Sequence, residues 1–548
     1  MLPRILFRSL LFLAIVLITM ALVVTWYKGY QGSIESILSF INTRKNSRDL
    51  SALITERRFR YIQFLLLVLI FFMVGLMFTF NTLYRIFSAL LSHLFQFIKS
   101  LFNTTLLSEN KFLMLIPIAG IFYYAIMMPV CYDEGLTYLY FSSKGILSSL
   151  SFYPEPNNHI LHSLFTNFTI HLPIGDTEFR LRLPSLVTSV ITWMLSYKLL
   201  LKYYNNQVAM LVTAIGSMIF LVFYYSYQSR GYALVVLFFI AALYNAFGII
   251  HKKDNKENWT WFGISCIMGF YTMPSFLYPF LTLNLIILLY NRPYLKRQVI
   301  TNAVITAVTV FLYTPIIIVN GLDALTNNPW VRSINRNQVV KMLPGFLKTT
   351  LNELTQLPWW LVLLLLLPSF IYAVVSRQKF ILSLFIIFML APAVFLLVQS
   401  VIPFPRTFIY YGFMLPFLAL ISFTDQFKKI PVIALTIALM ITQLVMLYLF
   451  NSRIYAYEER DPQLNMTSKK LTNMMVGNKR YFSSGNLLGT TLQYELKVQG
   501  FTNSTVVFGK GPVSADSLVN FDYIIIGLEN DQTKIKKPRI STVWYHIY

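Results

Sequence analysis

Long apolar runs separated by short polar segments fill most of the chain. Between residues 112 and 450 eleven such runs follow one another, and most are long enough to cross about 30 Å of hydrocarbon as a helix. They cover residues 112–130, 183–200, 207–225, 229–250, 259–274, 276–290, 299–319, 358–376, 380–401, 407–423 and 430–450. The pattern predicts an α-helical polytopic membrane core at residues 111–450.

The first 110 residues predict an N-terminal transmembrane or interfacial extension. Ile5–Trp26 and Tyr61–Phe80 are apolar enough to cross a membrane. Leu83–Asn103 carries polar residues at helical spacing along one face, so it either lies in the membrane interface or crosses as well. The choice decides the side on which the basic segment Lys28–Arg60 lies. We favour about thirteen transmembrane helices in total.

From about residue 451 the apolar runs give way to short runs of β-prone residues and one helical candidate. The strand candidates are Arg480–Ser483, Ser504–Phe508, Asp522–Ile526 and Val543–Tyr548, and the helix candidate is Gly489–Val498. They predict a small C-terminal α/β domain at residues 451–548. Its Gly509–Gly511 lacks the spacing and hydroxyl residue of a phosphate-binding loop, so a scaffold or docking module is the better interpretation.

Composition and charge place this protein in a membrane. Hydrophobic residues make up 56% of the chain and charged residues only 12%, which excludes an ordinary soluble protein. The net charge of +23 sits largely in short loops, as the positive-inside rule requires, so it does not indicate nucleic-acid binding. The rule places loops 131–180 and 320–358 and the C-terminal domain outside the cytoplasm. We therefore expect an integral protein of the inner membrane with an extracytoplasmic active site.

Two adjacent acids, Asp133 and Glu134, come directly after the apolar run at residues 112–130. Placing carboxylates close to hydrocarbon costs several kcal/mol, which favours a functional role for the pair. The setting is typical of an enzyme that works at the membrane surface on a lipid-carried substrate. The alternative is a hydrated pair of loop acids.

A second polar group follows in the same loop and contains Asn157, Asn158, His159 and His162. The two histidines are three residues apart and share a helical face, so they could coordinate a metal with Asp133 or bind sugar hydroxyls and phosphate. The two asparagines either bind substrate or cap the following helix. The two cysteines of the chain provide neither a disulfide framework nor a metal cluster.

Four motifs in this order resemble the membrane glycosyltransferases of the GT-C superfamily. They are Cys-Tyr-Asp-Glu-Gly at residues 131–135, then Pro156–Phe165, Phe179–Val187 and Tyr225–Leu234. The most similar branch contains the protein O-mannosyltransferases and the lipid A aminoarabinose transferase. The resemblance covers about residues 111–450. It implies a polyprenyl-phosphate sugar donor, an extracytoplasmic active site, and inversion at the anomeric carbon without a covalent enzyme intermediate.

The resemblance also implies roles for individual residues. Asp133 matches the catalytic acid of the family and is expected to act as the base, while Glu134 would tune Asp133 or bind the sugar or acceptor. Arg406 is the first choice for binding the departing phosphate and Arg230 the second, because a guanidinium fork matches phosphate geometry. Tyr232 would line the cavity, although aromatic packing between helices explains it equally well.

Two other arginines, Arg180 and Arg182, are expected to be structural or bound to lipid head groups. The Asp-Glu pair differs from the Asp-X-Asp of metal-dependent relatives, which argues against an obligatory Mn or Mg site. A divalent metal is compatible with the sequence but not required by it, and no other cofactor is indicated.

The function expected from the sequence is transfer of a sugar from a polyprenyl-phosphate donor to a protein, lipid A or surface-glycan acceptor. A polymerase that extends a lipid-linked glycan is an alternative within the same class. A transporter or flippase of lipid-linked sugars is the alternative from another class. Transporters usually show internal repeats and ionisable groups deep in the bilayer, whereas this chain shows no repeat and carries most charges near predicted helix ends.

Overall fold

The computed structural model describes most of the chain. The described residues are 2–41, 55–105, 109–153, 156–251, 255–326, 333–457, 480–483, 486–501, 504–508, 522–527, 540–541 and 545–547. They form two compact units, one of Met1–Thr104 with Tyr313–Leu325 and the other of Thr105–Leu312 with Thr326–Tyr548.

The first unit is built mainly from two long helices, α1 (Leu2–Ile41) and α3 (Glu56–Thr105). The helix α1 is kinked at Gly29, whose φ of 63° lies in the left-handed region that glycine tolerates. The helix α3 is 50 residues long and includes both predicted elements, Tyr61–Phe80 and Leu83–Asn103. Whether the second element crosses the membrane or lies in its interface is not decided by the helix itself, and both alternatives stay predictions. Residues 42–54 of the predicted basic segment lie outside the described part.

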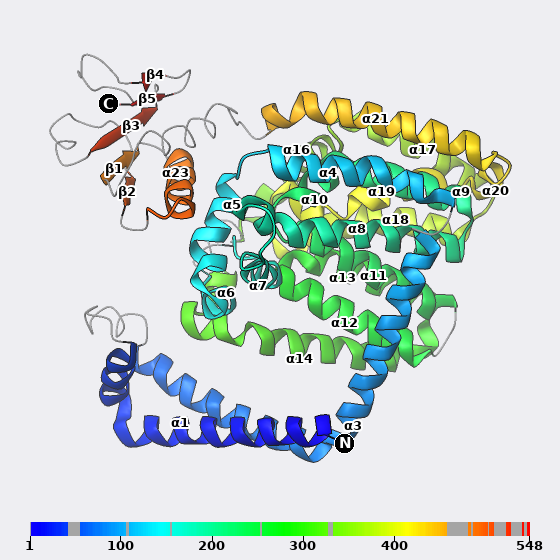
Figure 1. Ribbon diagram of the computed structural model, residues 1–548. Coiled ribbons are helices and arrows are strands. Elements are labelled where there is room, and N and C mark those ends of the chain that lie inside the picture. Colours follow the sequence, from blue (N-terminus) through cyan, green and yellow to red (C-terminus); the bar gives the residue numbers. More distant parts are fainter. Residues whose placement is uncertain are drawn as a thin grey trace. The chain divides into compact units, whose positions relative to one another are not determined.

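The second unit contains a bundle of apolar helices (Figure 1). They are α4 (Leu115–Met127), α8 (Thr177–Tyr203), α9 (Asn206–Met218), α10 (Phe220–Tyr227), α11 (Tyr232–His251), α12 (Lys256–Thr272), α13 (Leu277–Tyr290), α14 (Leu295–Asn320), α17 (Trp359–Val375), α18 (Lys379–Gln399), α19 (Tyr411–Ile421) and α21 (Val432–Tyr457). The helix α11 packs against α8, α12 and α13, and most of its residues are buried. A helix apolar on nearly every side suits such a central position.

Six helices in the described residues are long and apolar enough to cross a membrane, and nine crossings result if each of three bent helix pairs counts as one. One bent pair is α9 and α10, which meet at 67° where the sequence predicted a single span at 207–225. Every predicted span of the core contains a helix of the structure. The count of about thirteen transmembrane helices stays a prediction.

Both predicted extracytoplasmic loops contain short or amphipathic helices. Loop 131–180 forms α5 (Tyr132–Leu136), η2 (Thr137–Phe141), η3 (Ser142–Lys144), α6 (Ile146–Ser151) and α7 (Ile160–Thr169). Loop 320–358 forms α15 (Asp323–Thr326) and α16 (Arg336–Thr355), with residues 327–332 outside the described part. The loop α18–α19 holds one further turn, η6 (Pro405–Phe408).

The C-terminal segment contains a five-stranded sheet in the order β2-β1-β3-β5-β4. Its strands are β1 (Arg480–Ser483), β2 (Thr505–Phe508), β3 (Tyr523–Gly527), β4 (Ile540–Ser541) and β5 (Tyr545–Ile547). The first three strands pair in parallel and the last two antiparallel. One helix, α23 (Asn486–Val498), follows β1, and Gly509–Gly511 lies outside the described residues. A separate extracytoplasmic domain at 451–548 stays a prediction.

Two glycines allow the backbones of α9 and α19 to approach each other closely. A Cβ atom on Gly216 would lie 3.6 Å from the carbonyl oxygen of Gly412, and a Cβ atom on Gly412 would lie 2.2 Å from a methyl carbon of Val222. Small residues at helix crossings serve this purpose in membrane proteins. By contrast, a Cβ atom on Gly345 in α16 would meet nothing within 4 Å.

We predict that Gly412→Ala lowers the free energy of unfolding by about 1–3 kcal/mol, since the added methyl group overpacks the contact with Val222. The control Gly345→Ala should be neutral or stabilising by up to about 1 kcal/mol. Thermal unfolding in detergent micelles measures both. Equal effects of the two substitutions would contradict the close contact.

Candidate functional site

The acid pair lies on α5, a single helical turn that starts directly after the non-helical residues that follow α4. The apolar helix that ends at Met127 and the helical segment Tyr132–Lys144 meet at 71°. Cys131 caps α5: its Sγ accepts the backbone N–H of Glu134 (3.4 Å), and its own N–H donates to Oε2 of Glu134 (3.0 Å). This reciprocal capping box fixes the start of the turn, where the helix dipole also favours carboxylates.

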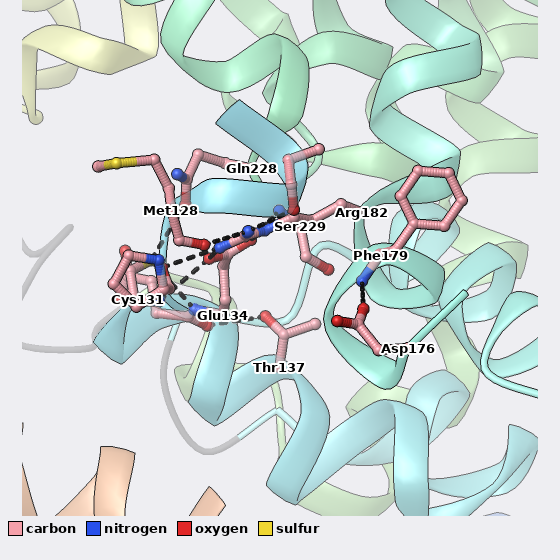
Figure 2. A network of polar contacts seen from close by, with 12 residues as sticks. Met128, Cys131, Glu134, Thr137, Asp176, Phe179, Arg182, Gln228 and Ser229 are labelled. Atoms are coloured by element: carbon pink, nitrogen blue, oxygen red, sulfur yellow. Dashed lines mark hydrogen bonds and ion pairs between the residues drawn. The ribbon is translucent and has the colours of Figure 1, made fainter. Parts of the chain in front are cut away.

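Glu134 forms a buried, bidentate ion pair with Arg182 of α8 (Figure 2). Nε of Arg182 donates to Oε1 of Glu134 (2.9 Å) and Nη2 donates to Oε2 (2.8 Å), and neither side chain is exposed. The backbone N–H of Ser229 also donates to Oε1 of Glu134 (2.7 Å). The Glu134 carboxylate therefore holds α5, α8 and the turn between α10 and α11 together.

The remaining donors of Arg182 bind the end of α4. Nη1 donates to the carbonyl oxygens of Ala125 (2.8 Å) and Met128 (2.5 Å), and Nη2 donates to that of Pro129 (2.9 Å). These carbonyls have no partner inside the helix because α4 ends there. Arg182 is thus structural, one of the two roles that the sequence left open for it.

The role expected for Glu134 needs correction. The sequence suggested that Glu134 contacts the sugar or acceptor or tunes Asp133. In the structure Glu134 is buried, and both of its oxygens are engaged by Arg182 and by backbone N–H groups. No oxygen is left to meet a substrate, so the expectation that Glu134 binds the sugar or acceptor is corrected. A role in tuning Asp133 stays a prediction.

Asp133 points the other way and lies between two arginines. Its Oδ2 is 3.5 Å from Nη2 of Arg230 and 3.9 Å from Nη2 of Arg406, and its side chain is 28% exposed. Arg406 comes from η6, and its guanidinium lies 4.6 Å from the centre of the Phe404 ring. The structure therefore brings the predicted base and both predicted phosphate-binding arginines together from three distant segments.

Arg230 is almost fully buried, at 3% exposure. Its Nη1 donates to the carbonyl oxygen of Asn157 (3.2 Å) and to the side-chain Oδ1 of the same residue. Nε of Arg230 and Nδ2 of Asn157 are buried and have no hydrogen-bond partner in the part of the chain that the structure describes. Buried N–H groups rarely remain unpaired, which marks this place as one that can receive acceptors.

His159 presents a further N–H beside Arg230. Its Nδ1 accepts the backbone N–H of Gly231 (2.7 Å). Burial, with the charges of Arg230, His162 and Arg406, lowers the pKa of His159 well below its usual 6.5, so the ring is neutral. The hydrogen-bond geometry then assigns its one proton to Nε2, which lies 3.5 Å from Nη2 of Arg230. Two N–H groups thus lie side by side, 3.5 Å apart.

Packing around the ring holds His159 in place. Tyr232 meets it edge to face at 5.1 Å and is itself buried, so Tyr232 supports the imidazole. A Cβ atom on residue 231 would lie 2.7 Å from Cβ of His159 and 2.9 Å from Cγ2 of Thr272, so only glycine fits there. A cavity-lining role for Tyr232 stays a prediction.

Asn158 and His162 do not face Asp133 in the way the sequence suggested. Nδ2 of Asn158 donates to the carbonyl oxygens of Ser149 and Phe152 (both 2.9 Å), and its Oδ1 accepts the hydroxyl of Ser163 (2.7 Å). The expectation that Asn158 binds substrate is corrected, because its polar atoms are used within the protein. No side-chain cap starts α7, so the capping alternative is not seen either.

His162 is fully buried, and its Nε2 lies 3.2 Å from the hydroxyl of Ser185 in α8. Burial, helped by the charge of Arg230, lowers the pKa of His162 to about 3. This side chain is therefore neutral, and its Nδ1 is buried without a hydrogen-bond partner among the described residues. A role of His162 in substrate binding stays a prediction. Among the described residues, no group of three or more His, Cys, Asp and Glu side chains is placed to hold a metal ion.

Sequence reasoning missed three residues that shape the site. They are Cys131, Ser229 and Gly231. A signal for Cys131 existed, since Cys131 and Glu134 have the capping-box spacing just before a helix. Ser229 contributes a backbone N–H, which any residue could supply, so the sequence carried no signal for it.

Comparisons with known proteins give one family match and similar solved structures. Residues 158–318 match the family model described as dolichyl-phosphate-mannose-protein mannosyltransferase. ArnT from Cupriavidus metallidurans in the apo state has a similar structure, with a TM-score of 0.53, 11% identity, and coverage of 76% of this chain and 92% of that chain. The same protein bound to undecaprenyl phosphate gives a TM-score of 0.51, 10% identity, and coverage of 80% and 98%. No curated protein sequence matches significantly.

The apolar helices and the similarity in fold indicate an integral membrane protein. The match at residues 158–318 and the shared fold support the resemblance to the GT-C superfamily.

We predict that Glu134→Gln destabilises the protein by about 3–5 kcal/mol, because it leaves the buried guanidinium of Arg182 without a counter-charge. The double variant Glu134→Leu/Arg182→Met should recover part of this loss, since it removes both buried charges. Thermal unfolding of Glu134→Leu, Arg182→Met and the double variant gives the coupling energy. Additive effects would contradict the pairing.

Stability should also fall in acid because of His162. The unfolded chain binds a proton at this residue below pH 6.5, whereas the folded chain does so only near pH 3. Between these two pKa values, one such group lowers the free energy of unfolding by about 1.4 kcal/mol for each pH unit. Above pH 6.5 it has no effect. The unfolding temperature of His162→Asn should therefore depend less steeply on pH between 7 and 5 than that of the wild type. An unchanged slope would contradict burial of a neutral His162.

Proposed function

We propose that this protein transfers a sugar from a polyprenyl-phosphate donor to an extracytoplasmic acceptor, with inversion at the anomeric carbon. The observation that carries the proposal is the Asp133 carboxylate within 4 Å of both Arg230 and Arg406. The neutral N–H of His159 lies beside them. This set offers one base and several donors to a phosphate.

Charge balance supports a phosphodiester donor. Arg230, Arg406 and Asp133 together carry a net charge of +1, and Glu353 also interacts with Arg406. A polyprenyl-phosphate sugar carries one negative charge, which the two guanidinium groups can bind. Since the Asp133–arginine distances of 3.5 and 3.9 Å are long for ion pairs, the phosphate can take over both guanidinium groups. Asp133 is then released to act as a base.

In the proposed reaction, Asp133 accepts the proton of the acceptor while the acceptor atom attacks the anomeric carbon. The bond between that carbon and the phosphate oxygen breaks, and the electron pair leaves with the polyprenyl phosphate. Arg230, Arg406 and the Nε2–H of His159 stabilise the second negative charge that the phosphate gains. Attack opposite the departing phosphate inverts the anomeric centre.

Two further lines support a lipid-phosphate donor. The matched family model is named for a dolichyl-phosphate-mannose-dependent enzyme, and one structure of the same fold was solved with undecaprenyl phosphate. The topology that accompanies the proposal has about thirteen crossings in the inner membrane. It puts Asp133 and the segment 451–548 on the extracytoplasmic side, where protein, lipid or surface-glycan acceptors are found.

We predict that Asp133→Asn lowers sugar transfer at least 100-fold, because the amide cannot accept the proton, and that it leaves lipid-phosphate binding intact. Arg230→Gln and Arg406→Gln should each weaken binding of undecaprenyl phosphate at least tenfold. Native mass spectrometry with undecaprenyl phosphate measures binding. Sugar transfer is measured by mass spectrometry of envelope glycans, in cells that lack the native protein and express each variant in its place.

The matched control is Asp425→Asn, which changes an exposed carboxylate on α20 (Thr424–Phe427). It should behave as the wild type in both measurements. Unchanged glycans in cells that lack the protein would contradict the proposed transferase activity. If Asp133→Asn still moved lipid-linked sugars across a vesicle membrane and the wild type transferred none, the protein would be a transporter.

A further inference from the structure

A helix from the far C-terminal part of the chain packs on the turn that carries Asp133. The helix α23 contacts α5, and Gly135 lies at this contact. A Cβ atom on Gly135 would lie 3.6 Å from Cγ2 of Thr490 and 3.8 Å from Cβ of Tyr494, which is ordinary contact distance.

Tyr494 fills the space between the segments that meet at α5. It is 1% exposed and forms one hydrophobic cluster with Val130, Leu139 and Leu181. Its ring also meets Tyr138 edge to face at 5.2 Å. These neighbours come from the break after α4, from η2 and from α8. One side chain of α23 therefore touches all three segments that position the acid turn.

Lys497 provides a second attachment one turn further along α23. Its Nζ donates to the hydroxyl of Ser143 (2.5 Å) and lies 5.3 Å from the centre of the Tyr138 ring. The contact thus continues beyond α5 into η2 and η3, and it combines apolar packing with a polar tie.

A helical turn as short as α5 cannot hold its conformation alone, because a few intrahelical hydrogen bonds do not repay the cost of nucleation. The capping box and the Glu134–Arg182 pair fix its start and its inner face. The face at Gly135 is covered by α23. Asp133, two residues before Gly135, depends on both supports.

We propose that α23 is a clamp that positions Asp133 for catalysis, with Tyr494 as the positioning residue. This rests on the proposed function, in which Asp133 is the base. Displacement of a reacting group by about 1 Å can cost 100-fold in rate. Loss of the clamp therefore lowers kcat, whereas binding of the lipid phosphate, which Arg230 and Arg406 perform, is retained.

The clamp can be tested by replacing Tyr494 with a cysteine that forms a disulfide with a cysteine at residue 135. The Cβ–Cβ distance of 3.8 Å between residues 135 and 494 equals the mean for disulfides, so Gly135→Cys with Tyr494→Cys should form one. Both native cysteines, Cys131 and Cys266, are buried and free. The pair is best built on Cys131→Ser, in which the serine hydroxyl still caps α5 and disulfide exchange with residue 131 is prevented.

We expect the oxidised variant to keep at least half of the kcat of the Cys131→Ser parent. Reduction should lower its kcat at least tenfold without changing binding of undecaprenyl phosphate by more than twofold. The parent itself should be insensitive to the reductant. Peptide mass spectrometry confirms the 135–494 bond. Tyr494→Phe should retain activity, because the hydroxyl has no hydrogen-bond partner among the described residues.

Equal activity of the oxidised and reduced forms would overturn the clamp, and so would failure of the two cysteines to pair. Retained binding of undecaprenyl phosphate in the reduced form distinguishes a misplaced Asp133 from an unfolded protein, and its loss would also overturn the proposal. Asp133→Asn in the oxidised variant separates the two proposals. If the Asp133→Asn form stays active, the proposed function fails. If the Asp133→Asn form is inactive while reduction of the disulfide has no effect on the variant that keeps Asp133, only the clamp fails.

Discussion

A guanidinium group without any solvent exposure must place its N–H groups on acceptors, and Arg182 does so with Glu134 and three carbonyl oxygens at the end of α4. Leaving any of these acceptors out would leave a charged donor unpaired in a medium of low dielectric constant. The end of α4, the start of α5 and the position of α8 are therefore fixed together. The turn before Arg230 is fixed as well, through the N–H of Ser229.

This constraint separates the two adjacent acids into different roles. Consecutive residues of a helix point about 100° apart, so a turn that directs Glu134 inward directs Asp133 away from it. Glu134 takes the buried counter-charge, and Asp133 remains partly exposed between Arg230 and Arg406. The two adjacent carboxylates therefore have different surroundings, one buried and paired and the other partly exposed. The two hydrogen bonds from Arg182 that hold Glu134 in the interior also leave Asp133 beside Arg230 and Arg406.

The sequence was sufficient for the features that depend on composition and order. The apolar runs predicted the helices of the core, and the motifs predicted that Asp133, Arg230 and Arg406 belong to one site. It was insufficient where a side chain has two chemically reasonable partners. Glu134, Asn158 and His162 are polar residues near the site, and only tertiary packing shows that their partners are Arg182, Ser149 and Ser185. The helix α3 joins Tyr61–Phe80 and Leu83–Asn103, because a change of surface polarity, without a proline or glycine, does not end a helix.

His159 shows how the fold controls charge at the proposed phosphate site. A protonated imidazole beside Arg230 and Arg406 would add a third cation to a buried site, and burial together with these arginines opposes it. The N–H of Gly231 fills Nδ1, which leaves the proton on Nε2, the nitrogen next to Arg230. The site thus gains a donor without gaining a charge. A donor of this kind strengthens contact with a phosphate as negative charge develops, yet it does not compete with Asp133 for the role of base. Only glycine at residue 231 allows the backbone N–H to approach His159 so closely. The backbone at this position therefore helps to keep the proton of His159 on Nε2.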